Sequence, residues 1–224
     1  MPGLICSDYV WSPQARDLES YGVTAVPGYG AAASIAAMAR SVLDIMPERV
    51  ALAGHSMGAR VALEIFRMAP ERVERIALLD TGVHPRQPGE RDKRMRLLQT
   101  GKQHGMQALV DEWLPPMVHP QRRQDADFMA PLYQMAVDAG VDQFERQVEA
   151  LLARPDAAPL LAKIRCPALV GVGRQDEWSP VAQHEAIAAA IPDADLVIFE
   201  DAAHMAPLEA PEQVSKALIN WLEK

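Results

Sequence analysis

Residues 50–68 read VALAGHSMGARVALEIFRM, and this stretch decides the fold. Its first part, Val50–Ala53, is a short apolar run rich in β-formers, and its last part, Gly58–Met68, has apolar residues at helical spacing. Between them, residues 54–58 form a Gly-x-Ser-x-Gly pattern. The stretch therefore predicts a strand, a sharp turn and a helix, with Ser56 in the turn.

The same alternation of strand and helix continues on both sides of this stretch. Four more β-rich runs, each closed by Gly, Pro, Asp or Glu, are Val23–Val26, Arg75–Leu79, Ala168–Val172 and Asp195–Phe199. Three more helical stretches are Ala32–Ile45, Val181–Ile191 and Pro211–Leu222. Short apolar strands joined by helices predict an α/β fold, with a predominantly parallel sheet and helices on both faces.

One region breaks the alternation. Residues 84–159 contain no strand-like run, only helical patterns separated by Pro-rich turns, at Gly89–Thr100, Met106–Trp113, Gln124–Ala139 and Val141–Ala153. We expect 84–159 to be a helical cap inserted over the site, with residues 1–83 and 160–224 forming the α/β core. The alternative is a helical segment that packs on the sheet without any role at the site.

Composition excludes several classes of protein. The chain has 224 residues and a net charge of −8, so no basic surface favours nucleic acid or an anionic membrane. Cys6 and Cys166 match no metal or redox spacing, and we expect them to be reduced thiols. The start shows no targeting segment, and no run approaches the roughly 18 apolar residues of a membrane span. We expect a cytoplasmic protein without metal or cofactor, and leave its oligomeric state open.

The serine in the turn is a candidate nucleophile. Small residues two positions before and after Ser56 let the strand and the helix pack closely around a strained backbone. The helix N-terminus then supplies positive potential for a developing negative charge. A purely structural glycine-rich turn is the alternative interpretation.

A serine nucleophile needs a base and an acid that orients it. His204 follows the last predicted strand, and parallel strands end at one edge of the sheet, so it is expected beside Ser56. The other five histidines are expected to be surface or packing residues. Asp176, just past Ala168–Val172, is the expected acid because the order Ser, Asp, His fits. Asp80, at the end of another strand, is its rival.

The sequence resembles the α/β-hydrolase superfamily, in the branch of small serine esterases with a helical cap. The likeness rests on Gly-His-Ser-Met-Gly at 54–58, Pro-Glu-Arg-Val-Glu-Arg-Ile-Ala-Leu-Leu-Asp at 70–80, Gly-Arg-Gln-Asp at 173–176 and Ala-Ala-His-Met-Ala-Pro-Leu-Glu at 202–209. It implies that the backbone N–H of Met57 forms half of an oxyanion hole. The other half normally follows a His-Gly pair, here replaced by Pro-Gly, which makes the N–H of Leu4 the candidate.

The resemblance also implies a strand before this loop, in the middle of the sheet, which the sequence lacks. We expect an N-terminally shortened fold, in which Leu4–Cys6 serves as a stub strand, the flanking strands pair directly, or another chain fills the gap. The first two are favoured, and a natural product that begins upstream of Met1 is expected.

The expected function is hydrolysis of a small-molecule carboxylic ester through an acyl-enzyme. Lactone, thioester or carbon–carbon bond hydrolysis on the same triad is the alternative, and a catalytically silent ligand-binding member is a third. Large side chains in the cap and loops are expected to line an apolar substrate pocket. They are Trp113, Phe128, Tyr133, Trp178 and Met205.

Overall fold

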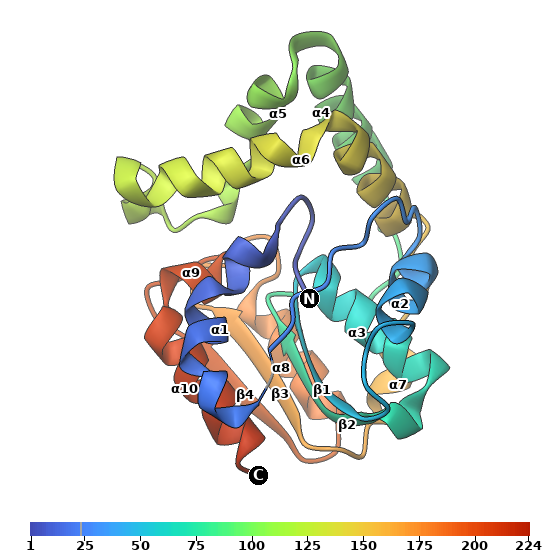
Figure 1. Ribbon diagram of the computed structural model, residues 1–224. Helices are drawn as coiled ribbons and strands as arrows, with labels where there is room; N and C mark the ends of the chain where they lie inside the picture. The colour runs from blue at the N-terminus through green and yellow to red at the C-terminus, as the bar shows by residue number, and fades with distance from the viewer. Residues whose placement is uncertain (23) are drawn as a thin grey trace.

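The computed structural model describes residues 1–22 and 24–224. These residues contain one sheet of four parallel strands in the order β1-β2-β3-β4. The strands are β1 (Val50–His55), β2 (Val73–Leu79), β3 (Ala168–Gly173) and β4 (Ala194–Phe199). Helices α1 and α10 cover one face of the sheet, and α3 and α8 cover the other (Figure 1). The predicted fold class is confirmed.

The helices lie close to the predicted stretches. In chain order they are α1 (Ser12–Asp17), α2 (Ile35–Leu43), α3 (Met57–Met68), α4 (Glu90–His104), α5 (Met106–Trp113), α6 (Ala126–Leu152), α7 (Ala158–Leu161), α8 (Val181–Ala190), α9 (Ala206–Glu209) and α10 (Pro211–Leu222). Side chains cap two of them, because Ser34 accepts from the Ala37 N–H and Asp125 from the Phe128 N–H. Of the helices in the described residues, none is long and apolar enough to cross a membrane.

The central strands β2 and β3 can be predicted from the sequence because both are deeply buried. Residues 76–79 of β2 are fully buried, and all six residues of β3 are buried. Strands covered by helices on both faces must be apolar throughout rather than alternating. The outer strand β4 is only partly buried and reads as a mixed run, with Asp195 inside it.

The prediction of a strand at Val23–Val26 is wrong for the part that is described. Residue 23 lies outside the described residues, and residues 24–26 form no strand. Thr24 and Ala25 are exposed and Val26 is half-buried. A β-rich run becomes a strand only when a neighbour satisfies its N–H and C=O groups, and none of the described strands lies beside these residues.

Helices α4, α5 and α6, which we call the cap helices, connect β2 to β3. Residues 84–159, all of them described, contain no strand, and the cap helices lie together beyond one end of the sheet (Figure 1). Gly140, at φ 74° and ψ 161°, divides α6 into two straight halves. This kink is where the sequence predicts a break between two helices, because only glycine adopts such a conformation readily.

The N-terminal segment runs along the free edge of β1. The amino group of Met1 donates to Ala53 O at 2.6 Å, and the His55 N–H donates to Met1 O at 3.1 Å. The predicted stub strand at Leu4–Cys6 is wrong, because these residues turn instead, with the Cys6 N–H bonded to Gly3 O at 3.2 Å. Ile5 has a φ of 47°, which is incompatible with an extended strand.

Candidate active site

Ser56 occupies the turn between β1 and α3. Its φ of 55° and ψ of −117° lie where a non-glycine residue is rarely found. Two hydrogen bonds, one with β2 and one with the loop that follows it, hold it there. The Ser56 N–H donates to Leu79 O at 2.8 Å, and Thr81 Oγ1 donates to Ser56 O at 2.9 Å. The strained turn places Ser56 in the wall of a cavity between the sheet and the cap helices.

The two glycines of the pattern are required by close backbone packing. A Cβ atom on Gly54 would lie 2.5 Å from backbone atoms of Ala59. One on Gly58 would lie 2.2 Å from Met1 O. Any side chain at either position would push α3 away from β1 or from the N-terminal segment.

Ser56, His204 and Asp176 are connected by a chain of two hydrogen bonds. His204 Nε2 lies 2.8 Å from Ser56 Oγ, and His204 Nδ1 lies 2.8 Å from Asp176 Oδ2. The other oxygen of Asp176 accepts from the N–H groups of Trp178 and Ser179, both at 2.8 Å. Every oxygen of this carboxylate is therefore engaged, which fixes the ring of His204 with Nδ1 protonated.

The rival carboxylate is buried nearby in a different environment. Asp80 Oδ1 accepts from the Gly173 N–H at 2.9 Å, and Oδ2 has no hydrogen-bond partner among the described residues. Burial and the nearby charge of Asp176 hold the pKa of Asp80 well above its ordinary value. Burial also acts to raise the pKa of Asp176, but the attraction and hydrogen bond of His204 outweigh it and lower that pKa. The two environments thus move the pKa values of Asp80 and Asp176 in opposite directions.

Sequence reasoning did not assign a role to Glu209, which holds the loop that carries His204. Its buried carboxylate accepts from the N–H groups of His119 at 2.6 Å, Ala203 at 2.9 Å and Met205 at 3.2 Å. Burial raises the pKa of Glu209, although these N–H groups oppose the shift. Its place in the 202–209 motif was a signal, since the residue directly follows the histidine loop.

Two further histidines, His55 and His184, form hydrogen bonds to the backbone around the site. His55 Nε2 donates to the carbonyl oxygen of His204 at 2.6 Å, so His55 lies beneath the loop. His184 Nε2 accepts from the Thr81 N–H at 2.8 Å, and Thr81 in turn holds Ser56. Burial lowers the pKa of His55 to about 3 and that of His184 to about 4. Both rings are neutral packing residues, as expected of histidines other than His204.

The buried His184 should make the protein acid-sensitive. Its pKa of about 4 in the folded protein lies below the value of about 6.5 in the unfolded chain. Between these two pH values the unfolded chain therefore binds a proton at this histidine and the folded chain does not. The free energy of unfolding therefore falls as the pH drops through this window. His184→Gln keeps an acceptor for the Thr81 N–H but cannot titrate. In urea unfolding, the free energy of unfolding of this variant should fall by about 1.5 kcal/mol less than that of the wild type between pH 6.5 and pH 5. An equal loss in both proteins would contradict this prediction.

The two residues expected to supply an oxyanion hole, Met57 and Leu4, both line the cavity that contains Ser56. Met57 is the first residue of α3, so its N–H has no acceptor within the helix. Leu4 lines the same cavity, and the backbone before it passes close to the nucleophile. A Cβ on Gly3 would lie 3.2 Å from Ser56 Cβ. The turn at Leu4 is tied to the cap, because the Ile5 N–H donates to Gln147 Oε1 on α6 at 2.7 Å.

The cavity over Ser56 has a volume of about 340 Å³. Of the five side chains predicted to line it, Trp113, Trp178 and Met205 do. Phe128 and Tyr133 do not, because the first half of α6 directs them elsewhere. Phe128 packs under the guanidinium of Arg122, and Tyr133 Oη reaches Gln107 O at 3.5 Å.

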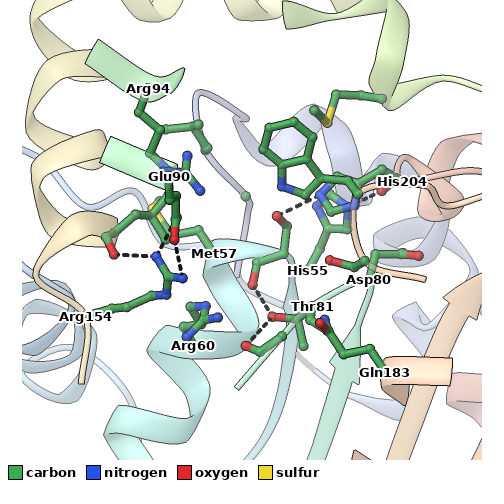
Figure 2. Close-up of a pocket in the computed structure, with 18 of the residues that line it drawn as sticks. His55, Met57, Arg60, Asp80, Thr81, Glu90, Arg94, Arg154, Gln183 and His204 are labelled. Carbon is green, nitrogen blue, oxygen red and sulfur yellow. Dashed lines mark hydrogen bonds and ion pairs between the residues drawn. The ribbon is translucent and has the colours of Figure 1, made fainter. Parts of the chain in front are cut away.

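The two sides of the cavity differ in chemistry. Figure 2 shows His55, Asp80 and His204 on one side and Arg60, Glu90, Arg94 and Arg154 on the other. The charged side was not predicted, since its members come from α3, α4 and the loop after α6. Among the described residues, no group of three or more His, Cys, Asp or Glu is arranged to hold a metal ion.

Comparisons with known proteins identify the family of this chain. The model of the Alpha/beta hydrolase family matches residues 6–217. The AB hydrolase superfamily protein YclE of Bacillus subtilis is 28% identical over 196 residues, which cover 79% of this chain and 69% of that protein. The 2-hydroxy-6-oxononadienedioate/2-hydroxy-6-oxononatrienedioate hydrolase 2 of Pseudomonas putida is 27% identical, over 82% of this chain and 66% of that protein. The chain thus spans about two thirds of the length of these relatives.

Solved structures show the same architecture. A thermophilic esterase from Thermogutta terrifontis superposes with a TM-score of 0.87 at 27% identity, over 99% of this chain and 87% of the esterase. The family match extends over nearly the whole chain, from the turn before α1 into α10. On this evidence, the chain belongs to the α/β-hydrolase family.

Proposed function

We propose that this chain hydrolyses carboxylic esters of small molecules through an acyl-enzyme formed on Ser56. The observation that carries the proposal is the hydrogen-bonded line from Ser56 Oγ through His204 to Asp176, with both contacts at 2.8 Å. These distances are what proton transfer from a serine to a histidine base requires. The solved esterase of similar fold supports the same bond type.

The proposed reaction has two halves. Ser56 Oγ attacks the ester carbonyl carbon while His204 Nε2 takes its proton, and the ionised Asp176 stabilises the resulting imidazolium. The N–H groups of Met57 and Leu4 are proposed to bind the carbonyl oxygen as it becomes negative. His204 then gives its proton to the departing alcohol. In the second half, water takes the place of the alcohol, with His204 again as the base, and the carboxylic acid is released.

One observation favours a second candidate. The relative from Pseudomonas putida is named for an oxo-dicarboxylate rather than for an ester. The same serine, histidine and aspartate would serve hydrolysis of a carbon–carbon bond beside a ketone. Lactones and thioesters present the same carbonyl to Ser56 and are further candidates.

A substrate panel tests the proposal. Purified protein is assayed with a short-chain 4-nitrophenyl ester, a lactone, a thioester and a vinylogous diketone, each with Ser56→Ala as the blank. We expect the ester to show the highest kcat/KM. Turnover of the diketone with no turnover of the ester would overturn the proposal and leave the second candidate. No Ser56-dependent turnover of any of the four would favour a ligand-binding role.

A further inference from the structure

The cavity over Ser56 contains a buried cation, Arg60, that pairs with no side chain of the described residues. Arg60 lies one turn along α3 from Ser56, lines the cavity and is only 8% exposed. Its Nη1 atom is buried and has no hydrogen-bond partner among the described residues. An arginine presents five N–H donors and is strongly disfavoured in a buried place without acceptors. Such a group in a cavity wall indicates a ligand that supplies the missing acceptor.

The neighbouring arginines differ from Arg60, because a carboxylate of the protein already pairs with them. Arg154 forms two bonds to Glu90, from Nη1 to Oε1 at 2.6 Å and from Nη2 to Oε2 at 2.7 Å. Arg94 Nε also donates to Glu90 Oε1, at 2.8 Å. Glu90 is thereby occupied by two cations and has no oxygen directed to Arg60. Figure 2 shows these bonds next to the unbonded Arg60.

This side of the cavity therefore has an excess of positive charge. Arg60, Lys93, Arg94 and Arg154 line this side of the cavity beside one carboxylate, Glu90, and the carboxylate of Asp156 also attracts Arg60. Burial, followed by repulsion from Arg154, lowers the pKa of Arg60 to about 9, which still leaves it protonated at neutral pH. An anion bound here would neutralise part of the positive charge and would also accept hydrogen bonds from the unpaired donors of Arg60.

We infer that Arg60 forms a subsite for a carboxylate carried by the substrate, so that the preferred substrates are esters with a free carboxylate near the scissile bond. The inference rests on the proposed ester hydrolysis and names its substrate class. One free guanidinium matches one planar, singly charged group, whereas a phosphate dianion would need more free donors. Because Arg60 lies one helical turn, roughly 6 Å of rise, from Ser56, the substrates to test first carry the carboxylate a few carbons from the reacting carbonyl.

Paired substrates test the subsite. 4-Nitrophenyl hydrogen glutarate and 4-nitrophenyl pentanoate have acyl chains of the same length and differ in the terminal carboxylate. The readout is the ratio of kcat/KM for the charged ester to kcat/KM for the neutral one. In Arg60→Met this ratio should fall about 30-fold or more, the usual consequence of leaving a buried carboxylate without its arginine. Arg60→Lys should restore part of it, and the exposed Arg91→Met, outside the cavity, should leave it unchanged.

Stability and binding distinguish this role from a structural one. Removing an unpaired buried charge should raise the Tm of Arg60→Met, whereas loss of a structural arginine would lower it. Calorimetric titration with glutarate, on Ser56→Ala protein, should detect binding that Arg60→Met in the same background abolishes. Inorganic phosphate should bind more weakly than glutarate.

The outcomes separate the two proposals. If neither ester is hydrolysed but glutarate binds through Arg60, the subsite stands and the ester chemistry is wrong. If both esters are hydrolysed with the same ratio in wild type and Arg60→Met, the subsite is wrong and the ester chemistry stands. Glutarate binding that does not change in Arg60→Met, or phosphate binding tighter than glutarate, would also overturn the carboxylate subsite.

Discussion

Ser56→Ala is expected to reduce kcat for ester hydrolysis about a million-fold. The substitution removes Ser56 Oγ, which is the proposed attacking atom and lies 2.8 Å from His204 Nε2. Alanine can enter the same turn because the backbone bonds to Leu79 and from Thr81 involve the main chain of residue 56. The residual rate would come from binding and from the backbone N–H groups alone.

The measurement compares initial rates with purified wild type, Ser56→Ala and Ser20→Ala. Ser20 is exposed and does not line the cavity, so its variant controls for handling of the protein. The Tm of Ser56→Ala should stay close to that of the wild type. Hydrolysis by a folded Ser56→Ala protein at more than about a thousandth of the wild-type rate would contradict the assignment.

Asp176→Asn should lower kcat about ten-thousand-fold, and Asp80→Asn far less. An asparagine at 176 can offer an N–H to His204 Nδ1, which would favour the wrong tautomer and leave Nε2 unable to accept the serine proton. It also removes the negative charge that stabilises the imidazolium. At position 80 the raised pKa favours the neutral acid, which asparagine resembles, and asparagine keeps an acceptor for the Gly173 N–H.

The two asparagine variants are therefore a matched pair. Both acids follow strands of the same sheet and both are buried, at 3% exposed for Asp176 and 0% for Asp80. Rates with one ester, corrected for the folded fraction, distinguish them. An inactive Asp80→Asn beside an active Asp176→Asn would show that the acid has been misassigned.

Much of the site could be predicted from the sequence because its chemistry lies at the ends of parallel strands. Ser56 follows β1, Asp176 follows β3 and His204 follows β4, and parallel strands bring these ends to one edge. Each strand is short, mainly apolar towards its end and closed by a turn, so its end is visible in the sequence. The conclusion required no knowledge of how the helices pack.

Other features depend on partners that a local pattern does not reveal. Residues 24–26 have the composition of a strand but no strand beside them in the described part of the chain. Arg60 has no carboxylate partner because Glu90, thirty residues away in the sequence, is already bonded to Arg154, which follows α6. Glu209 looks like one more charge on a helix until its contacts with the His204 loop are seen. Burial and long-range pairing decide these roles.

The helical segment between β2 and β3 has some features that the sequence predicts and others that it does not. Gly140 and the Pro-rich turns mark where its helices end, so the break within α6 was visible. The direction that each side chain takes was not. Trp113 reaches the cavity, while Phe128 and Tyr133, on a helix that packs against α5, do not.

The central claim is that Ser56 is a nucleophile activated by His204, and covalent trapping tests it most directly. The wild type is treated with an activated phosphonate ester, and intact-protein and peptide mass spectrometry then locate the adduct. We predict a single adduct on Ser56, none on Ser56→Ala, and a strongly slowed reaction with His204→Ala. An adduct on any other residue, or no reaction of the wild type, would contradict the account.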